Sequence, residues 1–248
     1  MQNQNKHIYF LSDAHLGSRL VENPRKHEER LVHWLDRIKS NASTIYLLGD
    51  IFDFWFEYKT VVPKGFVRLF GKLAELIDNG IDIHFFTGNH DIWAFDYFEK
   101  EIGLKVRRKP LTVEHFGKTF YLQHGDFPDF INNIFKNKFL QCAFACVPPR
   151  IGQNLGYFWA KKHRENLSES ETQYKGENNE PIIIFAKKYV QTHKVDYLVF
   201  GHRHLPLNLQ LATGERVIFL GDFINLFTYG EFDGENFQIK INEYPPET

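Results

Sequence analysis

Five short motifs in this sequence combine histidine, aspartate and asparagine in patterns that suit metal binding. They are Asp13-x-His15, Gly49-Asp50-x-x-Asp53, Gly88-Asn89-His90-Asp91, His124-Gly125-Asp126 and Gly201-His202-x-His204. Imidazole nitrogens together with carboxylate and amide oxygens favour borderline divalent ions such as Mn, Fe, Zn or Co. The motifs offer more ligands than a single ion can use. We therefore expect two metal sites that share a bridging carboxylate.

Each motif taken alone has an ordinary structural explanation. An aspartate at the end of a strand, such as Asp13, is often a turn residue or a helix cap. His124 alone would be read as a core histidine and Asn89 alone as a turn residue. The pair His202-x-His204 is more informative, because alternate residues of an extended segment point to the same side. The occurrence of all five motifs in one chain favours a metal centre over unrelated structural roles.

Most of these motifs come directly after a predicted buried strand. Strands are expected at Ile8–Ser12, Thr44–Leu48, Ile81–Thr87 and Asp196–Phe200. The spacing of apolar residues predicts helices at Pro24–Lys39, Lys64–Asn79 and Pro181–His193. The alternation of strands and helices indicates an α/β fold. In such folds functional residues collect where strands end and loops begin, so the fold should bring the motifs together.

The later part of the chain shows a different pattern. A hairpin is expected from Leu111–His115 and Lys118–His124, with further strands at Leu207–Ala212, Arg216–Leu220 and Phe237–Tyr244. Between the hairpin and the next helix, the segment Asp129–Asn166 is aromatic and helical in pattern, with a break at Pro148-Pro149.

The composition excludes several classes of protein. The chain has 248 residues, of which 43% are hydrophobic and 25% are charged, as in ordinary globular domains. Its formal net charge of -1 gives no general electrostatic attraction to nucleic acid. No apolar stretch is long enough to span a bilayer, and the polar start Met1–Lys6 does not resemble a signal peptide, so we expect a cytoplasmic protein. Nothing in the sequence indicates an obligate protein partner.

The only two cysteines, Cys142 and Cys146, exclude a disulfide framework and indicate a reducing compartment. They lie one helical turn apart, which would allow a site for a soft metal. We interpret them instead as buried core thiols, since free cysteine is among the most buried residue types.

The five motifs, in this order, resemble the calcineurin-like metallophosphoesterase superfamily. The resemblance covers Ser12 to His204 and implies one domain over 1–248, folded as a four-layer α/β/β/α sandwich with a dinuclear metal site. Carried over by position, it implies one ion held by Asp13, His15 and His204, and a second held by Asn89, His124 and His202, with Asp50 as the bridge. It also implies that His90 contacts the phosphate and donates a proton, and that Asp91 orients His90.

Charge considerations also favour phosphate chemistry. Two divalent ions outweigh the carboxylates of Asp13 and Asp50, so the centre should attract a phosphoryl group and stabilise its transition state. Bound metal can lower the pKa of water to about 7, so no serine or cysteine nucleophile is needed. His90 would protonate the leaving oxygen.

A narrower resemblance is to the UDP-2,3-diacylglucosamine pyrophosphatases of lipid A synthesis. It is carried by the aromatic segment after His124, by Lys161-Lys162-His163-Arg164-Glu165-Asn166 and by the sequence around Gly201-His202-Arg203-His204. It implies a helical lid at 126–170 and hydrolysis of UDP-2,3-diacylglucosamine to UMP and 2,3-diacylglucosamine 1-phosphate. The implied substrate contacts are Asn89, His90, Arg164, Asn166 and His202. One departure is His90, where the well-studied enzymes have arginine.

The expected lid has an apolar stripe that allows two interpretations. The stripe consists of Phe130, Ile131, Ile134 and Phe135, continued by Phe139, Ala143 and Cys146. Next to Tyr157-Phe158-Trp159 lies the basic cluster Lys161–Arg164. The combination suits a lipid-linked anion, or peripheral contact with the cytoplasmic face of the inner membrane. The alternative is a helical pair that packs its stripe on the core.

Two other functions stay open at this point. One is a phosphodiesterase or phosphomonoesterase that acts on a nucleotide or another non-lipid substrate. The other is a non-catalytic scaffold, which should have lost ligands, whereas every expected ligand is present. We expect manganese as the metal, with Fe, Zn or Co as alternatives.

Overall fold

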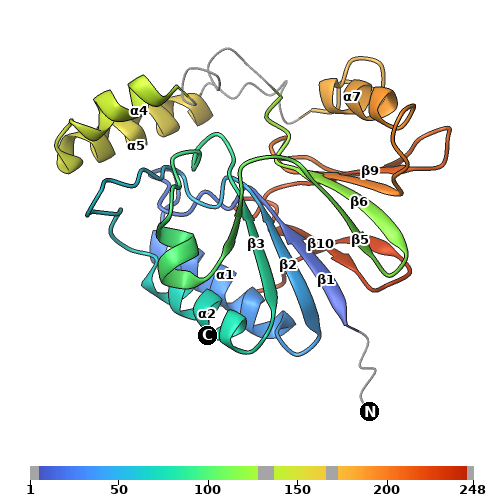
Figure 1. The fold of residues 1–248 in the computed structure, drawn as a ribbon, viewed down its shortest axis with the longest axis horizontal. Coiled ribbons are helices and arrows are strands. Elements are labelled where there is room, and N and C mark those ends of the chain that lie inside the picture. The colour runs from blue at the N-terminus through green and yellow to red at the C-terminus, as the bar shows by residue number, and fades with distance from the viewer. Residues whose placement is uncertain (1–5, 128–136, 166–172, 245–248) are drawn as a thin grey trace.

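A computed structural model describes residues 6–127, 137–165 and 173–244 (Figure 1). The strands are β1 (His7–Leu11), β2 (Ala42–Leu48), β3 (Asp82–Phe86), β4 (Lys105–Arg107), β5 (Leu111–His115), β6 (Lys118–Gln123), β7 (Tyr197–Phe200), β8 (Pro206–Gln210), β9 (Arg216–Leu220), β10 (Thr228–Phe232) and β11 (Phe237–Ile241). The helices are α1 (Pro24–Ile38), α2 (Val67–Asp78), the short π-helix η1 (Phe98–Ile102), α4 (Lys138–Ala145), α5 (Pro149–Glu165) and α7 (Pro181–Tyr189).

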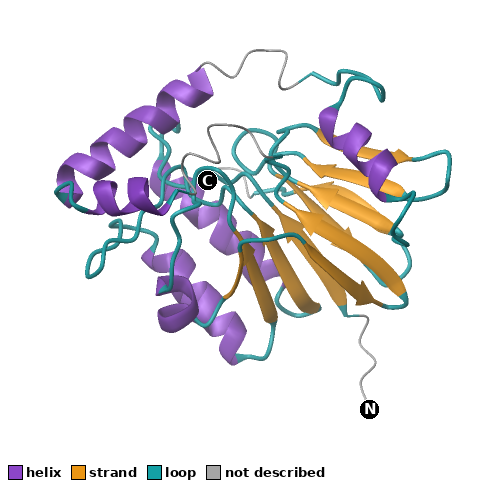
Figure 2. Cartoon of the chain, turned by 45° about the horizontal axis from the view of Figure 1, so that its top comes forward, coloured by secondary structure: helices purple, strands orange, loops and turns teal. Residues whose placement is uncertain are grey.

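The strands form two sheets, which lie next to each other between the helices (Figure 2). The first sheet has the order β11-β10-β1-β2-β3-β4, and the second has the order β5-β6-β7-β9-β8. Strands β1 to β4 are parallel, as expected for strands joined by helical crossovers. Strand β10 pairs antiparallel with β1, with Gly230 opposite Phe10, so residues from the two ends of the described chain are neighbours.

Period-two alternation along the strands divides the core into three layers of side chains. In β1, Ile8 and Phe10 pack between the two sheets, whereas Tyr9 and Leu11 pack against α1 and α2. In the second sheet, alternate residues such as Leu198 face α7. Helices α1 and α2 therefore cover one outer face and α7 covers the other (Figure 1). The predicted α/β/β/α sandwich is confirmed.

The helix boundaries follow local sequence signals. Helix α1 begins with a proline after Asn23, whose side chain accepts a hydrogen bond from the Lys26 amide. Helix α2 begins three residues later than Lys64, because Phe66 adopts a left-handed conformation and leads the chain into the helix. The same helix ends at the expected Asn79-Gly80, where Gly80 has a φ of 84°.

Three elements were not predicted from the sequence. They are η1, β4 and β10. The first two are short, and β10 carries a glycine at its centre, which lowers the signal of a strand.

Helices α4 and α5 occupy the predicted aromatic segment, and α5 begins at Pro149, where the break was expected. Residues 130–135 of the apolar stripe lie outside the described residues. Helix α4 buries none of its residues, and Phe139 is 87% exposed. The prediction of buried core thiols is wrong, because Cys142 on this helix and Cys146 directly after it are both exposed. The assignment of 1–248 as one domain with a lid at 126–170 stays a prediction.

None of the described helices has both the length and the apolar character that a membrane crossing requires.

Candidate metal centre

The motif residues lie in loops that follow β1, β2, β3, β6 and β7. Strands β1, β2 and β3 are parallel, and so are β6 and β7, so the loops after each group lie at one edge of each sheet. The two edges face each other, because the sheets pack together through side chains such as Phe10 and Phe120. This arrangement brings residues distant in sequence to one place.

The ligand-bearing loops adopt unusual backbone conformations. Five of the expected ligands have positive φ, at Asp13 (54°), His15 (45°), Asp50 (53°), His202 (67°) and His204 (45°). Such conformations cost about 1–3 kcal/mol each and gather at functional sites. Gly49 lets two loops approach closely, since a Cβ there would lie 2.6 Å from Nδ1 of His124.

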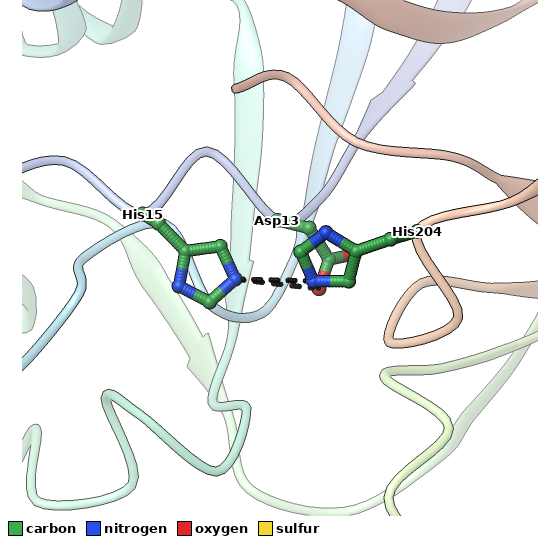
Figure 3. Close-up of side chains that lie close together, drawn as sticks. All are labelled: Asp13, His15 and His204. Atoms are coloured by element: carbon green, nitrogen blue, oxygen red, sulfur yellow. Dashed lines mark hydrogen bonds and ion pairs between the residues drawn. The ribbon is translucent and has the colours of Figure 1, made fainter. Parts of the chain in front are cut away.

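One group of side chains consists of Asp13, His15 and His204 (Figure 3). Nε2 of His15 lies 3.3 Å from Nε2 of His204, and Asp13 Oδ1 lies 3.4 Å from the same His204 nitrogen. Asp13 Oδ1 is buried and accepts no hydrogen bond within the described part of the chain. Three ligand atoms that converge in this way, with one oxygen left unsatisfied, fit a divalent cation between them.

A second group consists of Asn89, His124 and His202. Nε2 of His124 lies 3.3 Å from Oδ1 of Asn89, and the rings of His124 and His202 have centroids 5.2 Å apart. Asp50 stands between the two groups, with Oδ2 3.4 Å from His124 Nε2 and 4.0 Å from His15 Nε2. The structure therefore brings all seven expected ligands together, with Asp50 in the central position.

The outer nitrogens of three of the histidine rings lie near oxygen atoms of the protein. Nδ1 of His124 donates to the Leu48 carbonyl at 2.8 Å. Nδ1 of His204 lies 3.6 Å from Asp222 Oδ2, and Nδ1 of His15 lies 3.5 Å from Asp53 Oδ1. A carbonyl or carboxylate beside the outer nitrogen is typical of metal-binding histidines, although Nδ1 of His15 forms no hydrogen bond within the described residues.

The sequence analysis did not identify Asp222 as a neighbour of a ligand histidine. It included Asp53 in a motif but assigned no role to this residue. Gly221-Asp222 follows the buried strand β9 just as Gly49-Asp50 follows β2, and this repeated pattern could have identified it.

The electrostatics of the centre favour a cation. Burial alone would raise the pKa of Asp50, but the imidazoles of His124 and His90 hold this pKa well below its usual range. Burial would lower the pKa of His124, yet the Asp50 carboxylate outweighs it and raises the pKa well above its usual value. Surroundings that favour positive charge at this point fit a metal ion.

His90 and Asp91 are placed differently from the expectation. Nδ1 of His90 lies 2.7 Å from the carbonyl oxygen of Asp53, so this nitrogen donates to the backbone. The Asp91 carboxylate instead accepts hydrogen bonds from the amides of Gly88 at 2.6 Å and Ile51 at 2.9 Å. Burial raises the pKa of Asp91 to about 7. The Asp53 carbonyl, and not Asp91 as expected, therefore orients the His90 ring. Asp91 instead connects the loop after β3 to the loop after β2.

An apolar cavity of about 280 Å³ borders the centre. Asn89 and His90 line it on the side of the ligands, and aromatic and aliphatic side chains from α4, α5 and the loops line the rest. The ring of Trp159, from α5, has its centroid 5.2 Å from that of His90. The cavity thus opens an apolar space directly beside the polar centre.

The predicted substrate residue Arg164 reaches the centre from α5. Its guanidinium lies 3.0 Å from Asp53 Oδ1 and also contacts Ser18 Oγ. Burial raises the pKa of Asp53 to about 7, against the attraction of Arg164. Asn166, the other residue expected to contact the substrate from this segment of the sequence, lies outside the described residues.

A buried ion pair supports the last motif. Arg203, between the two histidines, has Nε 2.8 Å from Oε1 of Glu180, which is fully buried at the start of α7. The pair anchors the loop of His202 and His204 to the second sheet and its helix. Nothing in the local sequence around Glu180 marks this partnership.

Comparison with known proteins agrees with this geometry. The family model of calcineurin-like phosphoesterases matches residues 6–206. The chain is 42% identical over 255 residues to a Porphyromonas gingivalis protein named UDP-2,3-diacylglucosamine hydrolase, covering 95% of this chain and 97% of that protein. A Haemophilus influenzae protein of the same name is 26% identical over 230 residues, covering 88% and 91%.

Among solved structures, a phosphoesterase from E. coli is similar with a TM-score of 0.43 and 18% identity, over 91% of this chain and 87% of that one. The family match alone spans most of the chain, and it includes every ligand-bearing loop. The chain therefore belongs to the calcineurin-like phosphoesterase family, as a hydrolase of phosphoester bonds whose histidine and aspartate cluster is its candidate divalent metal site.

Proposed function

We propose that this enzyme hydrolyses the pyrophosphate bond of UDP-2,3-diacylglucosamine, giving UMP and 2,3-diacylglucosamine 1-phosphate. The observation that carries this proposal is the apolar cavity of about 280 Å³ that borders His90 and Asn89. A small nucleotide needs no such space, whereas acyl chains attached close to the cleaved bond do. The names of the relatives from P. gingivalis and H. influenzae support the same substrate.

We propose two divalent ions at the centre, with manganese as the expected metal. Asp13, His15 and His204 would hold one ion, and Asn89, His124 and His202 the other, with Asp50 as the shared ligand. When bound, such ions supply an activated water molecule and neutralise charge on the phosphoryl group. Five of the seven side chains are buried, all except His202 and His204, so most of the set is arranged before the substrate arrives.

His90 is proposed as the proton donor to the leaving oxygen. Its Nδ1 proton is engaged by the Asp53 carbonyl, so the transferred proton must leave from Nε2. His90 lines the apolar cavity, which places it next to the bound substrate. Asn89 and His202 would contact the phosphoryl oxygens in addition to their role as metal ligands.

Arg164 is proposed to bind the substrate through its guanidinium, since arginine pairs well with phosphate and sugar oxygens. In the structure it pairs with Asp53, at 3.0 Å. An anionic substrate would compete with this carboxylate for the same cation. Asn166, for which the same role is proposed, follows two residues later.

Helices α4 and α5 are proposed as the lid over the acyl chains. Phe144 of α4 and Tyr157 of α5 both pack against the ring of Phe54, with centroid distances of 6.2 and 5.8 Å. Gly156 lies against the same ring, where a Cβ would overlap it. The helices thus form a wall of the cavity through close aromatic contact with the loop after β2.

Exposed apolar side chains of these helices are proposed to touch a membrane surface. Phe139, Ile151, Leu155 and Phe158 are exposed large apolar side chains on this pair of helices. Lys138, Arg150 and the lysines before Arg164 supply positive charge nearby, which favours anionic lipids. Co-sedimentation with vesicles that contain anionic phospholipid tests this contact. Phe139→Glu should weaken it, and equal recovery of both proteins in the pellet would contradict it.

A substrate panel with added Mn²⁺ tests the main proposal. It contains UDP-2,3-diacylglucosamine, bis-p-nitrophenyl phosphate, a cyclic nucleotide and a phosphopeptide, with products identified by mass spectrometry. We expect the highest kcat/KM for the lipid-linked nucleotide, with UMP as a product. Faster turnover of the cyclic nucleotide or the phosphopeptide would instead establish the alternative, a phosphodiesterase or phosphomonoesterase with a non-lipid substrate.

A further inference from the structure

A second cavity, of about 120 Å³, lies beside the metal centre and has the opposite character. Its walls include the consecutive basic residues Arg107, Arg108 and Lys109 and one carboxylate, Asp126. The lining therefore carries an excess of basic residues, of which Arg108 also lies beside Glu99, whereas the whole chain has a net charge of -1. A small recess with this lining attracts anions.

Two of the three cations are held in place by the protein. Nε of Arg107 donates to Nδ1 of His84 at 3.2 Å. The guanidinium of Arg108 donates to the Ala94 carbonyl at 3.1 Å and lies 3.5 Å from Glu99. These contacts fix the strand end that precedes Lys109.

Lys109 differs from its two neighbours. It is exposed, and it makes no hydrogen bond or ion pair with residues 6–127, 137–165 or 173–244. Its ammonium group is therefore available to an incoming anion at no loss of an existing partner. The proline that follows it restricts the backbone at this point.

The loop after β3 contributes to both cavities. Gly88 and the ligand His124 line the basic cavity, Asn89 and His90 line the apolar one, and Ile92 borders both. Asn89 of the apolar cavity and His124 of the basic cavity are neighbours, with Oδ1 and Nε2 3.3 Å apart. A molecule that occupied both cavities would therefore pass over these two proposed metal ligands. The lipid-linked nucleotide has one apolar end and one anionic end, joined by the bond to be cleaved.

We propose that the basic cavity binds the phosphate of the nucleoside monophosphate end of the substrate and of the released nucleotide, with Lys109 as the cation that engages it. The inference rests on the proposed function for the identity of the nucleotide. The cavity has room for about four water molecules, which suits a phosphate group with the nucleoside extending outward.

Calorimetric titration of UMP, uridine and inorganic phosphate into the Mn²⁺-loaded enzyme tests this site. The variants are Lys109→Glu and, as a milder change, Lys109→Gln. Lys194→Glu is the matched control, because Lys194 is also exposed and precedes β7 at the end opposite His202. We expect Lys109→Glu to weaken UMP binding about tenfold or more, as for loss of a charge-assisted hydrogen bond, and Lys109→Gln to weaken it less.

The expected control results are unchanged UMP affinity in Lys194→Glu, and uridine affinity that is equal in all four proteins. UMP affinity that is unchanged in Lys109→Glu would overturn the inference, as would uridine affinity that falls in parallel. Inorganic phosphate that binds as tightly as UMP would overturn the nucleotide assignment.

Hydrolysis of UDP-2,3-diacylglucosamine by the unaltered enzyme separates this inference from the proposed function. If the enzyme cleaves the lipid and its UMP affinity is the same with and without Lys109, the inference is refuted and the proposed function is not. Lys109-dependent UMP binding by an enzyme that leaves the lipid intact would refute the proposed function alone.

Discussion

The strand-end loops and the helices α4 and α5 both border the centre, but the protein holds them in different ways. Asp13, Asp53 and Asp91 in the loops are 0% exposed, and their carboxylates meet histidines, an arginine or backbone amides. Helix α4 buries none of its residues. Its described aromatic contacts to the loops come from Phe144 alone.

This difference suggests that the loops carry out the chemistry and that the helices recognise the substrate. The loops are fixed by buried hydrogen bonds and by the sheets that carry them, so a change there should affect every substrate alike. Apart from the Arg164 contact with Asp53, the helices contribute mainly an apolar wall, so a change in that wall should matter only for substrates that reach it. The predictions that follow test this division.

The largest effect is expected for Asp50→Asn. The substitution removes the negative charge between the two ligand groups while it keeps an oxygen for the His90 amide, which donates to Asp50 Oδ1 at 2.8 Å. We expect kcat to fall by about 10⁴-fold or more on all substrates, with reduced metal content by elemental analysis. Asp36→Asn, at an exposed carboxylate of α1, is the control. A variant that retains its full metal content and activity would exclude Asp50 as the bridge.

His90→Ala should lower kcat by about 10²–10⁴-fold, the usual contribution of a general acid. The metal content should not change if the seven proposed ligands are the complete set, although His90 also forms a candidate metal-binding group with His15 and Asp53. Steady-state kinetics and metal analysis on the same preparation check both statements. Loss of metal would show instead that His90 is a ligand, a result that its proximity to His15, at 4.8 Å between ring centroids, makes worth testing.

Gly156→Ala is expected to act on the lipid substrate only. The new methyl group would overlap the Phe54 ring and push α5 away from it, which opens the wall of the apolar cavity. Loss of one such contact is worth about 1.5–3 kcal/mol, or roughly ten- to a hundredfold in kcat/KM for UDP-2,3-diacylglucosamine. Hydrolysis of bis-p-nitrophenyl phosphate should stay the same.

Gly71→Ala is the matched control for that helix substitution. Gly71 lies within α2, and a Cβ there would meet no atom within 4 Å. The substitution should stabilise the protein by about 0.5–1 kcal/mol through helix propensity, without an effect on either substrate. Equal losses on both substrates in Gly156→Ala would show that α5 supports the metal loops as well.

The smallest effect concerns stability at low pH. Burial lowers the pKa of His84, although Asp82 opposes this and Arg107 adds to it. Since the folded state then binds fewer protons than the unfolded state, stability is full above pH 6.5 and falls as the pH drops below that value. Nearby His115 acts in the same direction, because burial lowers its pKa too. His84→Gln should flatten the decline in Tm measured between pH 7 and 5, and an unchanged slope would contradict this assignment.

The ligand loops were predictable because their signals are local. Each ligand adjoins the end of a buried strand, and the strand itself is visible as an apolar run, as for Asp50 after β2. The partners of these ligands come from elsewhere in the chain. Glu180 reaches the last motif only through the packing of α7, and Asp53 turns towards His15 and Arg164 only in the folded loop.

The unpredicted strand β10 shows a different reason for failure. Gly230 at its centre indicates a turn when read locally. In the fold the same glycine is required, because a Cβ there would lie 2.7 Å from the ring of Phe237.

The stripe of α4 illustrates a third reason. A row of apolar residues reveals one apolar face, but not whether protein or lipid covers it.

The position of β10 beside β1 has a consequence for synthesis. Strand β1 lies inside its sheet, between β2 and β10, and its partner Phe232 is made more than two hundred residues after Ile8. A growing chain on the ribosome therefore cannot close the first sheet until nearly all of the described chain has emerged. His204 is also made late. The complete ligand set can therefore form only after His204 has been made, and a product truncated before β10 would leave one edge of β1 unpaired and open to aggregation.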